Sequence, residues 1–234
     1  NKSPMSQVAD GVWCVRAPKP GPHVALVGGT HGNELAGIGV IKEFLQCFGS
    51  GLWELTAGTL TLAFGNPEAI RLGTRATDPS RDLNRCFGTD LLTTSTTDPE
   101  SSRARVLAEA LKDAEIGIDL HATNLPSTPF LFTQAIKNAQ TERVLGHFSP
   151  RLLLTDPHWI FAGGPSTLDE YFNRDDHRVG ICFEMGFAAD LSHVAGVSLE
   201  LLDLLSSLSM VSSLVWTSTG PSFRKDAYEL VEAI

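Results

Sequence analysis

A short apolar segment that leads into a glycine-rich loop is the feature that most constrains the fold. Residues Val24–Gly28 form a continuous apolar run, which is typical of a strand buried on both faces. Beyond the loop, apolar residues recur at helical spacing from Leu35 to Leu45. The same reasoning predicts strands at Thr59–Phe64, Ile116–Leu120 and Val179–Met185, and helices from Pro99 to about Lys112 and from Ser198 to Val215.

Strands that alternate with helices predict an α/β fold with a mainly parallel or mixed central sheet and helices on both faces. Ligands of such sheets bind beyond the carboxyl ends of the strands. Candidate site residues should therefore follow directly after the apolar strand segments. The stretch Arg71–Asp98 has many turn formers and no sustained period, so we expect a long loop, which in a compact domain is often functional.

Length and composition exclude several classes of protein. With 234 residues, 42% hydrophobic and 19% charged, the chain is large enough for one buried core of ordinary size. A net charge of −9 without a block of Lys or Arg argues against nucleic-acid binding. The sequence contains no run of about 18 apolar residues, so no membrane span is predicted. The four cysteines show no pairing pattern, which favours reduced thiols and a cytoplasmic location.

Four side chains with metal or acid–base chemistry follow the predicted strands. His31 and Glu34 lie in the loop after the first strand, His121 follows Leu120, and Glu184 ends another strand. Two histidines and one carboxylate are a common protein ligand set for catalytic zinc, which leaves one position for water. The remaining glutamate could then act as the general base on that water.

The H-x-x-E spacing alone is weak evidence, because a surface pair with this spacing arises often by chance. Here the pair lies in a loop whose glycines permit a sharp turn, and a second histidine follows another strand. A phosphate-binding loop is the competing interpretation, since Gly28, Gly29 and Gly32 precede a helix. Neither G-x-x-x-x-G-K-[ST] nor G-x-G-x-x-G is present, which disfavours that alternative.

Several arginines fall within the predicted long loop. Arg71 and Arg75 precede Arg81–Arg85, a segment that reads Arg-Asp-Leu-Asn-Arg. A single surface arginine is usually only solvated, but the guanidinium group binds carboxylates through two parallel hydrogen bonds. A cluster of arginines in an acidic protein therefore indicates a site for an anionic substrate, and one arginine could also polarise the scissile carbonyl.

Together, four motifs resemble the aspartoacylase and succinylglutamate desuccinylase family, which is related to zinc carboxypeptidases. They are Gly28–Glu34, Asp82–Arg85, Asp119–His121 and Phe183–Gly186, in the family's order. The resemblance covers about His23 to Gly186. It implies a zinc-carboxypeptidase-like fold and hydrolysis of a small, anionic N-acyl amino acid of the N-acetylaspartate or N-succinylglutamate type.

The resemblance also implies roles for matching residues. His31, Glu34 and His121 match the ligands of one zinc ion per chain, and Glu184 matches the general base that activates water. Arg75 resembles, more loosely, the arginine that helps to polarise the acyl carbonyl.

Other matching residues are expected to hold the substrate or the ligands in place. Asn84, Arg85 and Arg174 match positions that bind substrate carboxylates. Asp82 and Asp119 look like residues that orient the site without binding the metal.

The expected domain organisation follows the extent of the motifs. Residues 1–22 are predicted as an N-terminal extension, 23–218 as the zinc-hydrolase domain, and 219–234 as the incomplete start of a C-terminal β domain. The family resemblance further implies assembly into a homo-oligomer. Two alternatives remain at this point: a zinc carboxypeptidase that acts on peptides, and a non-catalytic protein that binds zinc or carboxylates.

Overall fold

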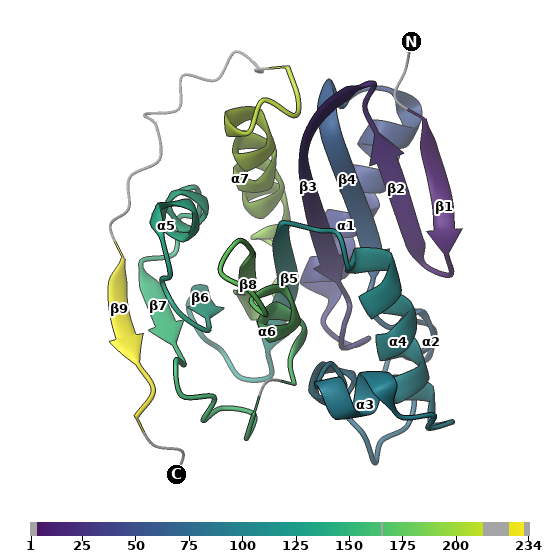
Figure 1. Cartoon of the computed structure of the whole chain (residues 1–234), viewed down its shortest axis with the longest axis vertical. Coiled ribbons are helices and arrows are strands. Elements are labelled where there is room, and N and C mark those ends of the chain that lie inside the picture. Colours follow the sequence, from purple (N-terminus) through teal and green to yellow (C-terminus); the bar gives the residue numbers. More distant parts are fainter. Residues whose placement is uncertain (1–3, 165, 213–224, 232–234) are drawn as a thin grey trace.

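The structure is a computed structural model that describes residues 4–164, 166–212 and 225–231. Within these residues, nine strands form one sheet in the order β1-β2-β4-β3-β5-β8-β6-β7-β9 (Figure 1). The strands are β1 (Met5–Ala9), β2 (Val12–Arg16), β3 (Lys19–Gly28), β4 (Ala57–Phe64), β5 (Ile116–Thr123), β6 (Phe130–Thr133), β7 (Leu152–Thr155), β8 (Val179–Phe187) and β9 (Asp226–Glu229).

The sheet is mixed, with a parallel centre. β4, β3, β5 and β8 run parallel to one another, whereas β1, β2 and β6 introduce antiparallel pairs. The connecting helices are α1 (Leu35–Ser50), α2 (Pro67–Leu72), η1 (Leu83–Arg85), α3 (Thr89–Thr93), α4 (Pro99–Leu111), α5 (Ala139–Gly146), α6 (Leu168–Phe172) and α7 (Val194–Ser207). The predicted α/β class with a mainly parallel or mixed sheet is confirmed.

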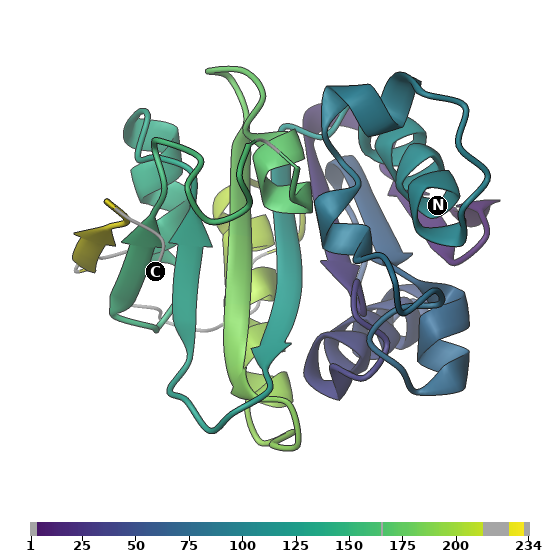
Figure 2. The same ribbon diagram turned by 90° about the horizontal axis from the view of Figure 1, so that it is seen from below.

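Alternating side chains divide the core between the two faces of the sheet. Val24 and Leu26 of β3 pack in one cluster with residues of α1, α5 and α7, whereas Ala25 and Val27 pack in a second cluster with residues of α4 and α6. Figure 2 shows these two helical layers on opposite sides of the strands. Because α6 approaches the sheet closely, only glycine fits beneath it: a Cβ on Gly117 would lie 2.1 Å from the Phe172 ring.

Helix boundaries follow the capping signals. Asp98 caps α4 as predicted, since its side chain accepts a hydrogen bond from Ser101 N–H, and Pro99 occupies the first turn. α1 ends at Ser50 and is capped by Gly51, whose φ of 77° suits glycine. α7 begins at Val194 and ends at Ser207, earlier than the predicted end at Val215, and residues 213–215 lie outside the described ranges.

Three predicted regions contain structure that periodicity did not reveal. The residues expected as an N-terminal extension form β1, β2 and the start of β3, all within the main sheet. The predicted long loop 71–98 contains η1 and α3. Of residues 219–234, only 225–231 are described, and there β9 pairs in parallel with β7. The domain boundaries therefore stay predictions.

Over the described residues, no helix is long and apolar enough to cross a membrane. All four cysteines carry free thiols. The predicted location and oligomeric state stay predictions.

Candidate metal centre

The loop between β3 and α1 brings two candidate ligands to one point. Gly29 has φ of 74°, a backbone conformation that favours glycine, and it starts the turn directly after β3. Gly32 packs against the backbone of α2, where a Cβ would lie only 2.1 Å from the carbonyl carbon of Ala69. The chain therefore turns tightly, and Glu34 becomes the residue that precedes α1.

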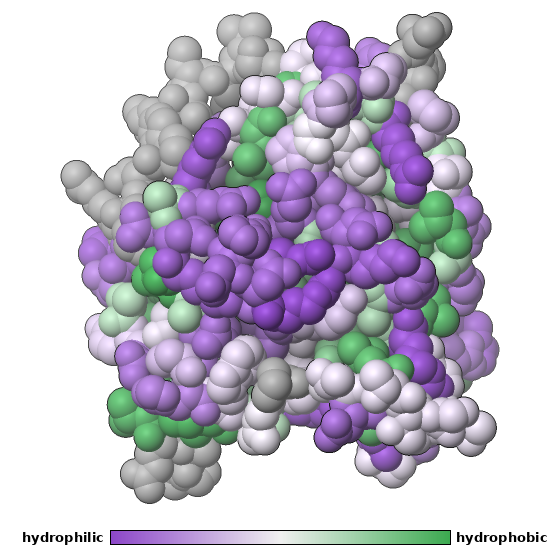
Figure 3. Space-filling model, viewed as in Figure 1, coloured by the Kyte–Doolittle hydropathy of each residue, from purple (hydrophilic) through white to green (hydrophobic). Residues whose placement is uncertain are grey.

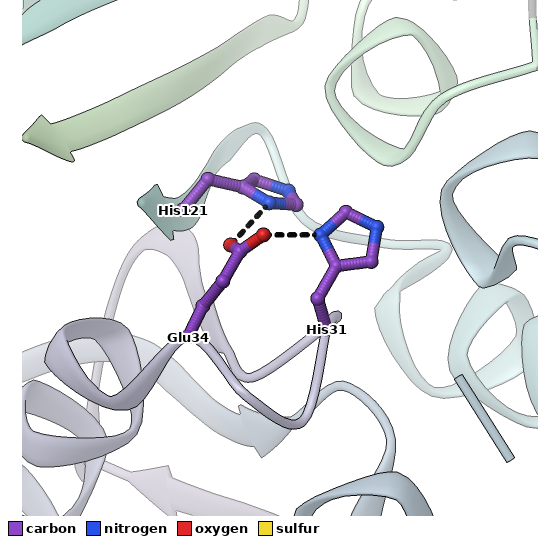
Figure 4. Close-up of side chains that lie close together, drawn as sticks. All are labelled: His31, Glu34 and His121. Carbon is purple, nitrogen blue, oxygen red and sulfur yellow. Dashed lines mark hydrogen bonds and ion pairs between the residues drawn. The ribbon is translucent and has the colours of Figure 1, made fainter. Parts of the chain in front are cut away.

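His31, Glu34 and His121 form a compact buried group (Figure 4). His31 Nδ1 lies 2.7 Å from Glu34 Oε1, and His121 Nδ1 lies 3.0 Å from Glu34 Oε2. One ligand atom from each residue lies within 4.8 Å of the others. His121 reaches the group from β5, the strand that pairs in parallel with β3. As predicted, residues that follow two neighbouring strands therefore meet at the carboxyl ends of those strands.

Each histidine is held from behind by a second carboxylate. His31 Nε2 lies 2.9 Å from Asp82 Oδ1, and His121 Nε2 lies 2.7 Å from Asp119 Oδ2. Asp119 is fully buried and also accepts a hydrogen bond from the Thr30 hydroxyl. Such outer carboxylates fix the tautomer and orientation of a metal-binding imidazole, so Asp82 and Asp119 lie where an orienting residue must lie.

Glu34 and His121 strongly shift each other's pKa values. Burial alone would raise the pKa of Glu34, but the charges and hydrogen bonds of His121 and His31 hold it well below its ordinary value. Burial would likewise lower the pKa of His121, whereas Asp119 and Glu34 raise it well above its ordinary value. Opposite charges therefore hold the three side chains together.

The chemistry of the donors fits a divalent metal ion. Both Nδ1 atoms and the Glu34 carboxylate converge, while both Nε2 atoms are turned toward carboxylates. In a metal site the converging nitrogen is deprotonated and the other donates its proton to the carboxylate behind it. Two imidazole nitrogens and a carboxylate make the three-ligand set that catalytic zinc uses.

Glu184 lies beside the group on the neighbouring strand. It pairs with His121 across β5 and β8, and both side chains extend from the sheet face that α6 covers. Burial raises the pKa of Glu184, and this effect outweighs the lowering by His121. Among the described residues, its Oε2 is buried without a hydrogen-bond partner. Such an oxygen beside His31, Glu34 and His121 suits a group that accepts a proton from water.

Arg75 also reaches the group, from the loop that precedes η1. Its Nη1 donates to Glu34 Oε1 at 3.3 Å and its Nη2 donates to Asp82 Oδ2 at 2.9 Å. Glu100 of α4 fixes this loop, because its buried carboxylate accepts hydrogen bonds from Thr77 N–H and Asp78 N–H. A guanidinium therefore lies close to the converging ligand atoms.

Asn84 and Arg85 approach the site from η1. The Nδ2 atom of Asn84 lies 3.4 Å from His121 Nε2, and its Oδ1 accepts a hydrogen bond from Leu168 N–H. Asn84 is 6% exposed, and these two contacts link His121 to the start of α6. Arg85 is half-buried, donates to the carbonyl of Asn84 and stacks at 4.9 Å on the ring of Phe161.

Arg174 is the predicted site residue that the structure does not bring to this group. Its guanidinium donates to the carbonyls of Tyr171 and Lys112 and stacks on the Tyr171 ring at 4.1 Å. Lys112 precedes β5 and Arg174 precedes β8, so this arginine lies at the amino ends of strands whose carboxyl ends carry the site. Residues 174–177 are exposed. The face of the molecule drawn in Figure 3 is largely hydrophilic across its middle.

The sequence reasoning missed the aromatic residues next to Glu184. β6 pairs with β8 so that Phe130 lies opposite Glu184 and Phe132 opposite Cys182. The Phe132 ring contacts the Phe161 ring, with 5.4 Å between the centroids. The short apolar run Phe130–Thr133 could have indicated a strand, but it gives no sign of which strand it joins.

A family model described as "Succinylglutamate desuccinylase/Aspartoacylase catalytic domain" matches residues 20–200. The chain belongs to this family. A mouse protein named "N-acyl-aromatic-L-amino acid amidohydrolase (carboxylate-forming)" is 29% identical over 221 residues, which cover 88% of this chain and 66% of the mouse protein. A "Probable aspartoacylase" of Nostoc sp. is 41% identical over 106 residues, or 43% of this chain and 35% of that protein.

Solved structures share the fold. The succinylglutamate desuccinylase from Chromobacterium violaceum matches with a TM-score of 0.72 at 23% identity, over 92% of this chain and 76% of that one. Murine aminoacylase 3 matches with a TM-score of 0.63 at 24% identity, over 82% of this chain and 66% of that one. The chain thus spans between about a third and two thirds of the lengths of the two curated relatives named above.

Proposed function

We propose that this protein hydrolyses the amide bond of small N-acyl amino acids with the help of a zinc ion held by His31, Glu34 and His121. The convergence of the two Nδ1 atoms on the Glu34 carboxylate, with a carboxylate behind each imidazole, is the observation that carries the proposal. Family membership supports it, because relatives bear the names of N-acyl amino acid amidohydrolases and aspartoacylases.

The metal and Glu184 have separate tasks in this proposal. When bound, zinc supplies Lewis-acid chemistry, since it polarises a carbonyl and lowers the pKa of water. Glu184 takes a proton from the attacking water at its carboxylate and then delivers it to the nitrogen of the leaving amine. The raised pKa makes the Glu184 carboxylate a stronger base, which favours the first transfer, in which it accepts the proton from water.

The arginines bind and stabilise negative charge. Arg75 lies within hydrogen-bond distance of Glu34, so its guanidinium is near enough to stabilise the oxyanion that develops on the scissile carbonyl. Arg85 binds the substrate carboxylate in this proposal, and the contacts of Asn84 with His121 and α6 support this role because they hold the segment against the site. Arg174 has no part in this arrangement.

Release of free amine from a panel of N-acyl amino acids tests the proposal. Zinc-loaded protein should release amine from at least one of N-acetylaspartate, N-succinylglutamate and N-acetylphenylalanine. Glu184→Gln should retain zinc and lose turnover by roughly 100- to 10,000-fold, because only the proton transfer is removed. Preference for dipeptides over every N-acyl amino acid would indicate that the protein is a carboxypeptidase and contradict the proposal. Binding of zinc and ligand without any turnover would indicate a non-catalytic binding protein.

A further inference from the structure

Arg75 lies on a segment without regular structure, between α2 and η1, although its guanidinium group contacts the metal centre. Its side chain is 43% exposed, and an arginine with this much freedom loses side-chain entropy when it is held in one conformation. The backbone of Arg75 is tied to the ligand loop, because its carbonyl accepts a hydrogen bond from Gly32 N–H at 3.3 Å. The position of the guanidinium group therefore depends on what else holds this segment.

Glu100 holds the residues that follow Arg75. It lies in the first turn of α4 and is fully buried. Its Oε1 accepts hydrogen bonds from Thr77 N–H at 2.6 Å and from Asp78 N–H at 3.2 Å. Hydrogen bonds to a carboxylate are stronger than those between neutral groups, so they fix Thr77 and Asp78 to the start of α4.

Asn66 holds the same segment through its side chain. Its Oδ1 accepts a hydrogen bond from the Thr77 hydroxyl at 2.9 Å, and its Nδ2 donates to Glu100 Oε1 at 3.2 Å. Asn66 is 3% exposed, and its backbone N–H donates to the carbonyl of Gly29, where the ligand loop begins. Thr77 is thus bound through its backbone to α4 and through its side chain to the N-cap of α2.

We propose that Glu100 is a positioning residue that, through Thr77, holds the guanidinium group of Arg75 against Glu34 and Asp82. Thr77 follows Arg75 by two residues, so a displacement of Thr77 reaches Arg75 over a short length of backbone. The inference rests on the proposed function, in which Arg75 stabilises the developing oxyanion. Misplacement of a reacting or stabilising group by about 1 Å can lower a rate by roughly 100-fold.

Arg75 also acts on the metal centre itself. Its Nη1 lies 3.3 Å from Glu34 Oε1, the oxygen that faces His31 Nδ1. A guanidinium group at this position repels a divalent cation and competes with it for the Glu34 carboxylate. Displacement of Arg75 should therefore tighten zinc binding while it slows hydrolysis. Damage to the ligand loop would weaken zinc binding, so the sign of the change separates the positioning of Arg75 from general support of the fold.

A double-mutant cycle between Glu100→Gln and Arg75→Ala tests the inference. Glutamine has nearly the same shape as glutamate but lacks its charge and has a single acceptor oxygen. Glu100→Gln should lower kcat by roughly 10- to 100-fold and tighten zinc binding by roughly two- to tenfold in a competition titration. In the Arg75→Ala background it should change either quantity by no more than about twofold, because the guanidinium group that it displaces is absent.

Glu109→Gln is the matched control, since Glu109 lies in the same helix and its side chain is 74% exposed. It should change neither kcat nor zinc affinity in either background. Equal effects of Glu100→Gln in both backgrounds, weaker zinc binding, or unchanged kcat and zinc affinity would each overturn the inference.

A milder variant covers the case in which Glu100→Gln does not fold. Thr77→Val removes the hydroxyl bond to Asn66 and keeps the backbone bond to Glu100, so it enters the same cycle with smaller changes of the same sign. Zinc affinity also separates this inference from the proposed function. If no N-acyl amino acid is hydrolysed, the proposed function fails, and the zinc-affinity cycle still decides whether Glu100 positions Arg75.

Discussion

Replacing Asp169 by asparagine should change how the free energy of unfolding depends on pH. Asp169 lies in the first turn of α6, is 2% exposed, and has one carboxylate oxygen that is buried without a hydrogen-bond partner among the described residues. Burial, and next the neighbouring charge of Glu170, raises the pKa of Asp169 from 3.8 to about 7. Asparagine has nearly the same shape and does not titrate.

The sign of the effect follows from proton binding. Between about pH 4 and pH 7 the folded protein holds a proton on Asp169 that the unfolded chain has lost, so stability falls as the pH rises through this range. The two pKa values differ by about three units, and at ~1.36 kcal/mol per unit the full cost is about 4 kcal/mol above pH 7. At pH 5 the cost is only about 2 kcal/mol. The stability of Asp169→Asn relative to the unmodified protein should therefore rise by roughly 2–3 kcal/mol from pH 5 to pH 8.

Urea unfolding of metal-free protein at pH 5, 6.5 and 8 measures this difference. Metal is removed because a divalent ion near His121 would itself lower the pKa of Asp169. The exposed residue Asp176 supplies a matched control, because Asp176→Asn should leave the difference constant across the same range. A flat difference for Asp169→Asn, or one that shrinks as the pH rises, would refute the reasoning from burial.

Other predictions concern the support of the ligands. Asp82→Asn removes the negative charge behind His31 and should weaken zinc binding by roughly 10- to 100-fold in a competition titration, whereas the exposed Asp90→Asn should not. Unchanged zinc affinity in Asp82→Asn would contradict the orienting role. Gly32→Ala places a methyl group against the backbone of α2 and should lower both zinc affinity and the free energy of unfolding, the latter by roughly 1–3 kcal/mol. Normal stability of Gly32→Ala would mean that the loop packs less tightly than the structure indicates.

Much of the sheet could be predicted because its central strands are buried on both faces. Such strands need continuous apolar runs, and Val24–Gly28 and Ile116–Leu120 supply them. The sequence patterns of β1 and β6 indicate strands less clearly. β1 is largely exposed, with polar residues in its middle, while β6 has only four residues. A short strand whose partners are distant in sequence has no local signature that fixes its place.

The meeting of His31, Glu34 and His121 could be predicted because the carboxyl ends of parallel neighbours meet at one edge of the sheet. Arg174 was misplaced for a related reason. Only ten residues separate it from Glu184, but a strand lies between them, and a strand rises about 3.3 Å per residue. From Val179 to Glu184 alone the chain travels roughly 17 Å, which carries Arg174 to the opposite edge.

The contacts of Phe161 with Phe132 and Arg85 could not be predicted because they depend on the tertiary structure. Phe132 and Phe161 meet through a loop whose shape is set by the buried carboxylate of Asp156. Nothing in the local pattern around Phe161 indicates that its ring will face Arg85, which lies 76 positions earlier in the chain.

Zinc content measured together with turnover tests the central claim most directly. Protein stripped of metal and then titrated with zinc should regain hydrolysis of an N-acyl amino acid in proportion to bound zinc, up to one ion per chain. His121→Ala should neither bind zinc tightly nor recover activity. Full hydrolysis in the stripped protein, or tight zinc binding by His121→Ala, would contradict the assignment of His31, Glu34 and His121 as the metal centre.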